Sequence, residues 1–250
     1  MRIGPALVLL AAAVACGSGI FRQYEYEEDV YLSLDGSATI YVNSSVPALN
    51  ALRGASFDAR PTAPVDRAAV REYFTTPVTR VTRVTASRRN NRRFLHARLE
   101  VEDVSRLGEA APFAWSSYQF TNGRDVVNYR QTVGRAAGKP VEQVRWTGKE
   151  IVAFRLHIPS RIVFHNAGAN NPRRGNILAW EQPLAERLEG TPLTLDARME
   201  PQSILYSTLL LFGGTLVAVA VMFALVIWWI LRTGSTEGLK AKGPGRRAEG

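Results

Sequence analysis

The chain contains a single cysteine, Cys16, in 250 residues. No internal disulfide is therefore available, and any folded domain must draw its stability from packing. Histidine is scarce as well. His96, His157 and His165 are the three present, and no second type of metal ligand stands near them at ligand spacing. These histidines are therefore interpreted as structural residues rather than as a metal site.

Motifs that would indicate an enzyme are also absent from the sequence. There is no G-x-S-x-G elbow for a serine nucleophile, and the GPGRR stretch near the end lacks the strand and helix of a phosphate-binding loop. Glu25, Glu27, Glu28 and Asp29 form an acidic cluster, which we interpret as a solvated strand edge rather than a catalytic carboxylate pair. We expect no catalytic residue, no cofactor and no metal.

Residues 204–231 contain no charged side chain. About 20 apolar residues cross the ~30 Å hydrocarbon core of a bilayer as a helix, so this run predicts one transmembrane helix. Tyr206 near one end and Trp228 and Trp229 near the other are typical of the headgroup layer. Gly214 and Ala218 form a small-xxx-small pair, which indicates weak self-association as one alternative.

The N-terminus has the pattern of an export signal. Arg2 precedes a ten-residue apolar run at 6–15, which is too short to span a bilayer, so residues 1–15 are predicted to be a signal peptide. Ala13 and Ala15 suit an ordinary cleavage site. The same small residues before Cys16 resemble a bacterial lipobox, in which this cysteine would be lipidated. Both alternatives are open, and lipidation of Cys16 is favoured.

The charge after the apolar run predicts the orientation of the chain. Residues 232–250 carry five basic and two acidic side chains, and basic residues that flank a span stay in the cytoplasm. We therefore expect a single-pass protein of the bacterial cytoplasmic membrane, with residues 16–203 outside. The tail is rich in glycine and polar residues, which predicts a disordered cytoplasmic segment.

The exported residues alternate between short strands and turns. Hairpins are predicted over 24–46 with a turn at Asp35-Gly36, over 78–102 with a turn at Asn90-Asn91, and over 115–133 with a turn at Asn122-Gly123. Further strands are expected at 151–158, 161–165, 177–180 and 192–199. A loop is expected after residue 46, followed by a short helix at 67–74 that is capped by Asp66. The predicted fold class is α+β, built on one largely antiparallel, meandering sheet with a few short helices.

The second of these hairpins is strongly basic. Seven arginines lie between residues 80 and 98, with no acid until Glu100. The turn at Asn90-Asn91 would gather four of them at the tip: Arg88, Arg89, Arg92 and Arg93. Such a cluster near a membrane favours anionic lipid headgroups, at about 1 kcal/mol for each basic group. An Arg-rich solvated face is the alternative, and because the domain is exported we expect no nucleic-acid partner.

Two motifs of the exported part resemble the LppM-like family of bacterial membrane lipoproteins. Residues 31–40 (YLSLDGSATI) are similar to the opening hairpin of that family. Pro159, Asn166, Asn176 and Trp180 resemble its segment before the final strand. The order of lipobox, exported domain, span and basic tail is also similar. The resemblance implies an α+β fold akin to lipid-transfer modules and an association with envelope glycolipids, and it transfers no catalytic residue.

These observations predict a non-enzymatic protein of the bacterial cell envelope whose exported domain binds or handles lipid or glycolipid. The alternative is a structural or assembly component that binds another envelope protein. An enclosed apolar cavity would favour lipid handling, whereas a flat exposed apolar patch would favour a protein partner.

Overall fold

The structure is a computed structural model that describes residues 22–139, 146–168 and 175–237. The chain separates into two compact units, one that ends at Ser203 and one that begins at Ile204. The division falls where the charge-free run of the sequence begins. Cys16 and the predicted signal peptide lie outside the described residues, as does most of the predicted tail.

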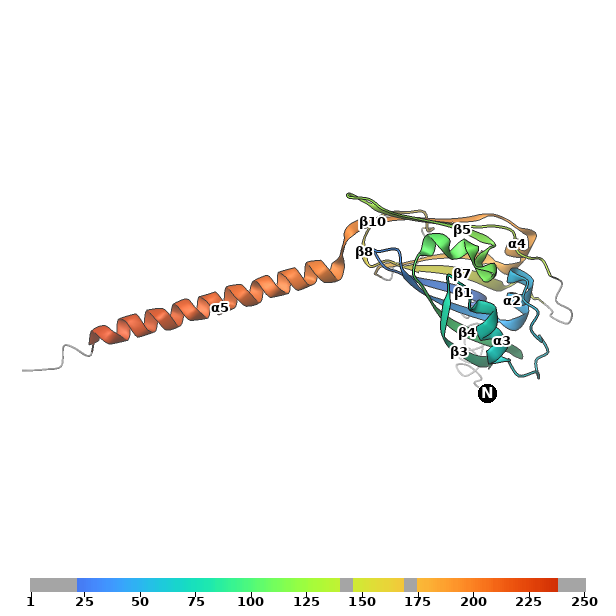
Figure 1. The fold of residues 1–250 in the computed structure, drawn as a ribbon, viewed down its shortest axis with the longest axis horizontal. Helices are drawn as coiled ribbons and strands as arrows, with labels where there is room; N and C mark the ends of the chain where they lie inside the picture. The colour runs from blue at the N-terminus through green and yellow to red at the C-terminus, as the bar shows by residue number, and fades with distance from the viewer. Residues whose placement is uncertain (1–21, 140–145, 169–174, 238–250) are drawn as a thin grey trace, which may run out of the picture. The chain divides into compact units, whose positions relative to one another are not determined.

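Six strands form the larger sheet of the first unit, in the spatial order β3-β4-β2-β1-β7-β9 (Figure 1). Neighbouring strands run antiparallel except for β1 and β7, which are parallel. The strands of this sheet are β1 (Gln23–Leu32), β2 (Ala38–Ser45), β3 (Arg80–Arg89), β4 (Arg92–Val101), β7 (Glu150–His157) and β9 (Ile177–Pro183).

Four strands form the smaller sheet, in the order β5-β6-β10-β8, and all of its pairs are antiparallel. These strands are β5 (Ser116–Asn122), β6 (Val127–Val133), β8 (Ser160–His165) and β10 (Leu193–Ser203). The short helices of the domain are α2 (Val46–Arg53), α3 (Arg67–Phe74), α4 (Leu184–Glu189) and the 3-10 helices η1 (Val104–Glu109) and η2 (Ala111–Phe113).

This architecture confirms the predicted α+β class and corrects the number of sheets from one to two. The two sheets part at Pro159, which links β7 of the larger sheet to β8 of the smaller sheet. Proline has no backbone N–H for a ladder, so a strand tends to end there. The chain then pairs β8 with β10, and this long-range pairing leaves no local signal in the sequence.

One apolar core lies between the two sheets. Val30, Ile40 and Leu99 stand in register across β1, β2 and β4, and all three are buried. Val133, Leu195 and Ala197 of the smaller sheet belong to the same buried cluster. Successive side chains of a strand point to opposite faces, so the other residues of the larger sheet, such as the half-exposed Tyr31, form an outer face that the smaller sheet does not cover.

The three predicted hairpins are confirmed, and the first two turns have the expected backbone geometry. The third differs, because residues 123–126 join β5 to β6 and neither Asn122 nor Gly123 has a positive φ. Gly36 has a φ of +89° in the turn between β1 and β2. Asn90 and Asn91 have φ values of +48° and +55° in the two-residue turn between β3 and β4. Positive φ at both central positions is what a type I′ turn requires, and asparagine tolerates it better than most residues.

The predicted loop after residue 46 is wrong at its start, where helix α2 forms. Ser45 caps this helix by accepting a hydrogen bond from the Ala48 backbone N–H, and Gly54 ends it with a φ of +71°. Pro47 lies in the first turn, where its missing N–H is not needed. Every residue of α2 is buried, so the helix has no polar face by which an amphipathic pattern would reveal it. Helix α3, capped by Asp66, is confirmed.

The second unit is helix α5 (Ile204–Glu237). Its stretch Ile204–Thr233 is long and apolar enough to cross a membrane. The most apolar 18-residue window has a mean hydropathy of 2.7, and none of that window is buried. Thirty residues of helix measure about 45 Å, more than the ~30 Å hydrocarbon core. The helix continues six residues beyond Leu231, into the segment predicted to be a disordered tail.

Candidate functional site

The inner face of the larger sheet holds one fully buried ion pair. The carboxylate of Glu28 on β1 accepts a hydrogen bond from the guanidinium of Arg53, the last residue of α2, and neither side chain is exposed. The Glu28 carboxylate also accepts hydrogen bonds from the Tyr26 hydroxyl at 2.9 Å and from the Gln131 amide of the smaller sheet at 3.1 Å. The pair therefore ties α2 and both sheets together.

Aromatic rings surround the Arg53 guanidinium. Its central carbon lies 4.5 Å from the ring centre of Phe113, 4.8 Å from that of Trp115 and 5.0 Å from that of Tyr26. Contacts of this kind stabilise a desolvated cation by about 2 kcal/mol or more. Burial raises the pKa of Glu28 to about 7 and lowers that of Arg53 to about 10, so both groups are charged between these values.

This network cannot serve as an active site in the described conformation, because a substrate cannot reach it. Glu28, Tyr26 and Arg53 have between 0% and 8% of their surface exposed. Buried charges persist where partners compensate them. Here the two terminal nitrogens of Arg53 donate hydrogen bonds and three rings surround the guanidinium, whereas its Nε has no hydrogen-bond partner among the described residues. We conclude that the pair organises the core.

The acidic cluster of β1 is not a solvated strand edge, because β1 lies in the middle of the larger sheet. Glu25 is buried on the outer face and is joined to Arg92 by an ion pair of 2.5 Å. Glu27 and Asp29 lie further along this face, and Arg155 of β7 forms ion pairs with both, at 2.7 Å and 3.4 Å. The acids therefore hold strands together, and Glu28 faces the core instead.

The four arginines predicted to contact lipid are not equivalent. Arg88 and Arg89 are exposed, whereas Arg92 and Arg93 are only partly so. The side chain of Arg92 is 14% exposed, because it pairs with Glu25, lies 3.5 Å from Glu150 and packs over Trp146. The turn at Asn90-Asn91 thus presents two arginines to solvent and uses a third to hold β4 against β1 and β7.

The tip of this hairpin and the last residue of the domain lie at opposite ends of the strands. At the tip, the Arg89 guanidinium donates a hydrogen bond to the backbone carbonyl of Tyr24, at the start of β1. At the other end, Ser203 pairs with Ser160, which follows β7 by three residues. Tyr31 of β1 pairs with His157 at the end of β7, and the seven residue steps from Tyr24 to Tyr31 measure about 24 Å at the rise of a strand. The arginines are therefore remote from the point where the chain leaves the domain.

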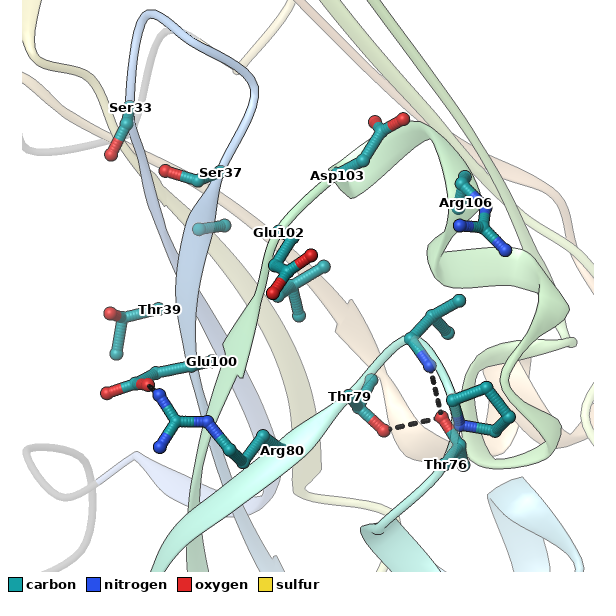
Figure 2. A pocket seen from close by; sticks show the side chains of 14 residues that line it. Ser33, Ser37, Thr39, Thr76, Thr79, Arg80, Glu100, Glu102, Asp103 and Arg106 are labelled. Carbon is teal, nitrogen blue, oxygen red and sulfur yellow. Dashed lines mark hydrogen bonds and ion pairs between the residues drawn. The ribbon is translucent and has the colours of Figure 1, made fainter.

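The larger of two described pockets opens beside the turn between β1 and β2 and has a volume of about 590 Å³ (Figure 2). Hydroxyl and charged side chains dominate its lining, among them Ser33, Thr39, Thr76, Glu102 and Arg106. Figure 2 shows the ion pair of Arg80 with Glu100 at one side and the hydrogen bond between the Thr76 and Thr79 hydroxyls at another. This open polar cleft is unlike the enclosed apolar cavity that would hold an acyl chain.

Within residues 22–139, 146–168 and 175–237, no three His, Cys, Asp or Glu side chains come together as metal ligands. His96 hydrogen-bonds to Ser87 and Asn43, and His157 stacks on Tyr31 with ring centres 3.7 Å apart. These contacts fit the structural role expected of both histidines.

Sequence reasoning missed Arg53, the partner of the buried Glu28, and Glu150, a buried acid beside Arg92. Arg53 lies in a helix with no amphipathic signal, and its partner is 25 positions away in the chain. Glu150 begins a strand, and its carboxylate accepts hydrogen bonds from the Thr147 and Gly148 backbone N–H groups at 2.9 Å each. A charged residue within a short apolar stretch such as VPALNALR is the one signal that points to Arg53.

Comparisons with known proteins establish no family. No family model matches the sequence, and no curated protein matches it. The structure is similar to the NMR structure of the folded domain of Mycobacterium tuberculosis LppM, with a TM-score of 0.40 and 11% sequence identity. The match covers 73% of this chain and 94% of that domain. Membership of the LppM-like family accordingly stays a prediction of the sequence motifs.

Proposed function

We propose that the chain is a non-enzymatic protein of the bacterial cell envelope, anchored by α5, whose exported domain binds the headgroups of anionic lipids or glycolipids. The proposal rests on one observation: the same chain contains an exposed apolar helix and a domain with exposed arginines on a hairpin. Lipidation of Cys16, the outside location of the domain and the cytoplasmic tail belong to the same proposal and rest on the sequence.

The described pockets favour headgroups over acyl chains as the ligand. The larger cleft is polar, and the interior between the sheets is filled by the apolar cluster and by the Glu28–Arg53 pair. The exposed arginines of the hairpin supply positive charge at the surface. Charged groups at a surface are screened over ~8 Å at physiological salt, so contact with a bilayer requires close approach.

Flotation of the isolated domain with vesicles tests this proposal. Residues 22–203 form a compact unit with their own core, so the domain can be prepared without α5. We expect several-fold more domain on phosphatidylglycerol vesicles than on phosphatidylcholine vesicles, and less at high salt. The double variant Arg88→Ser/Arg89→Ser should lose most of this preference. Arg92 is left in place because its removal would strip a buried carboxylate of its partner.

A matched control is the double variant Arg67→Ser/Arg124→Ser, which removes the same charge from exposed positions elsewhere in the domain. This control should float like the parent protein. Equal flotation of the parent on both kinds of vesicle would refute anionic-lipid binding. Equal losses in the two double variants would show that net charge, rather than the hairpin tip, attracts the membrane.

An assembly role is the second candidate, and β8 is the observation that favours it. This strand is an edge of the smaller sheet, and its Val163 and Phe164 are 59% and 45% exposed. Exposed apolar edge strands can pair with a strand of another protein. Val163→Lys should abolish co-purification of such a partner and leave vesicle flotation unchanged. Lost flotation in that variant would instead assign β8 to the lipid surface.

A further inference from the structure

A second, smaller cleft lies on the outer face of the larger sheet, over β2, β3 and β4. Its volume is about 300 Å³. The residues that line it are Tyr41 from β2, Arg83 and Thr85 from β3, and His96, Ala97 and Arg98 from β4. This cleft lies on the basic hairpin but away from its tip, and two arginines that the lipid prediction left aside belong to it.

A β-bulge in β3 decides which side chains meet here. Val81 pairs with Leu99, and the next paired residue of β3 is Arg83, which stands opposite Arg98. One residue of β3 is thus extra at this point. Without it, Arg83 would be out of phase with Arg98 and would face the core, since strand side chains alternate between faces. The bulge therefore places two guanidinium groups on the same face at directly opposed positions.

Directly opposed like charges destabilise a sheet unless something compensates them. In the described part of the chain, neither Arg83 nor Arg98 forms an ion pair with a carboxylate. The acids at neighbouring positions of this face are already engaged: Glu100 pairs with Arg80, and Asp29 pairs with Arg155. Two exposed arginines thus share one cleft, and none of the described residues that line it is an acid.

The remaining side chains of the cleft are uncharged, and one of them restricts the orientation of the Arg98 guanidinium. The Arg98 guanidinium packs over the Tyr41 ring at 5.6 Å, which limits its orientations. The ring nitrogens of His96 hydrogen-bond to Ser87 and Asn43, and burial lowers the pKa of this histidine, so it is neutral at pH 7. Thr85 and Tyr41 contribute hydroxyl groups to the lining.

We infer that this cleft binds a phosphate group between Arg83 and Arg98. The planar guanidinium fork matches phosphate oxygens with two parallel hydrogen bonds, and a compact anion would relieve the repulsion between the two arginines. A volume of about 300 Å³ is sufficient for a phosphate and the start of its ester. The phosphate can come from a phospholipid headgroup, which rests on the proposed function, or from a soluble phosphate ester.

Titration of the full chain in dodecyl maltoside, in a buffer free of phosphate and sulfate, tests the inference. Three probes separate the sources: inorganic phosphate, glycerol 3-phosphate, and dihexanoyl phosphatidylglycerol below its micelle concentration. Isothermal titration should give a saturable signal, and Arg83→Gln and Arg98→Gln should each weaken binding about tenfold or more. Arg98→Lys keeps the charge but loses the fork, so it should fall between the parent and Arg98→Gln.

Arg67→Gln is the matched control and should bind like the parent, and thermal unfolding should show all variants folded. Tightest binding of the short-chain lipid assigns the cleft to a headgroup, whereas tightest binding of glycerol 3-phosphate assigns it to a soluble ester. No saturable binding by the parent, or unchanged affinity in the Arg83→Gln/Arg98→Gln double variant, would overturn the inference. Such a result would leave the proposed membrane binding intact if flotation still depends on Arg88 and Arg89. Failure of the phosphate cleft can therefore be told apart from failure of the proposed function.

Discussion

On the inner face of the larger sheet, Arg53 is enclosed by a carboxylate and three aromatic rings. On the outer face Arg83 and Arg98 stand opposite each other, and within the described residues neither forms an ion pair with a carboxylate. The two arrangements have different physical consequences. A buried guanidinium needs every partner it has, because its desolvation cost is large. An exposed pair of guanidinium groups is solvated and can recruit an anion from outside. The contrast separates arginines that support the fold from arginines that are available for binding.

Removal of Arg53 should produce the largest effect. Arg53→Met leaves the Glu28 carboxylate buried without its cation, which costs about 3–5 kcal/mol in free energy of unfolding. For a domain of this size, the midpoint of thermal unfolding should fall by roughly 10–15 °C, as followed by circular dichroism. Arg83→Met is the outer-face control and should change stability by no more than about 0.5 kcal/mol. Similar losses of stability in both variants would contradict the difference between the inner and outer faces.

The pH dependence of stability should come next in size. Burial raises the pKa of Glu28 from an ordinary value near 4.5 to about 7 in the folded state. Between these values the folded protein binds a proton that the unfolded chain has released, so stability falls as pH rises from about 4.5 to 7. A shift of this size corresponds to about 3 kcal/mol.

Chemical unfolding at several pH values measures this effect against Glu28→Gln, which cannot titrate at position 28. Relative to that variant, the parent should gain stability as the pH is lowered from 7 toward 4.5. A parent that instead loses stability relative to Glu28→Gln would show that Arg53 keeps the carboxylate ionised through this range.

A smaller difference in stability is expected between two arginine variants of the hairpin tip. Arg92→Met removes the partner of the buried Glu25 carboxylate and should cost about 1–3 kcal/mol. Arg88→Met should cost no more than about 0.5 kcal/mol, because Arg88 is exposed and donates a hydrogen bond to Asn91 within its own turn. Urea unfolding of the two single variants makes the comparison. Equal midpoints would mean that the tip arginines form one surface cluster, as the sequence alone suggests.

Local patterns were sufficient to predict the hairpins, helix α3 and the apolar helix. Alternation and turn residues determine a hairpin within some 20 residues, as with the Asn90-Asn91 turn between β3 and β4. The parallel pairing of β1 with β7 could not be predicted, because it joins segments more than 100 residues apart. Helix α2 was missed for a different reason, since complete burial removes the amphipathic pattern.

The candidate site was only partly predictable for related reasons. The density of arginines between residues 80 and 98 pointed to the hairpin on which the proposed phosphate cleft lies. The exposure of each arginine depends on its partners from other strands. Arg92, for example, is largely buried because it pairs with Glu25 and Glu150. The cleft of Arg83 and Arg98 depends on a bulge that shifts the register by one residue. A strict alternation over β3 would have placed Arg83 on the core face.

Photo-crosslinking from the outer face in living cells tests the central claim most directly. Benzoylphenylalanine in place of Tyr41 puts a reactive ring beside the cleft of Arg83 and Arg98 in the full-length protein, and the same residue in place of Phe164 serves as the comparison on β8. We predict a lipid adduct by mass spectrometry at position 41, at several times the yield found at position 164. Protein adducts at position 164 together with no lipid adduct at position 41 would contradict a lipid-binding outer face and favour an assembly role.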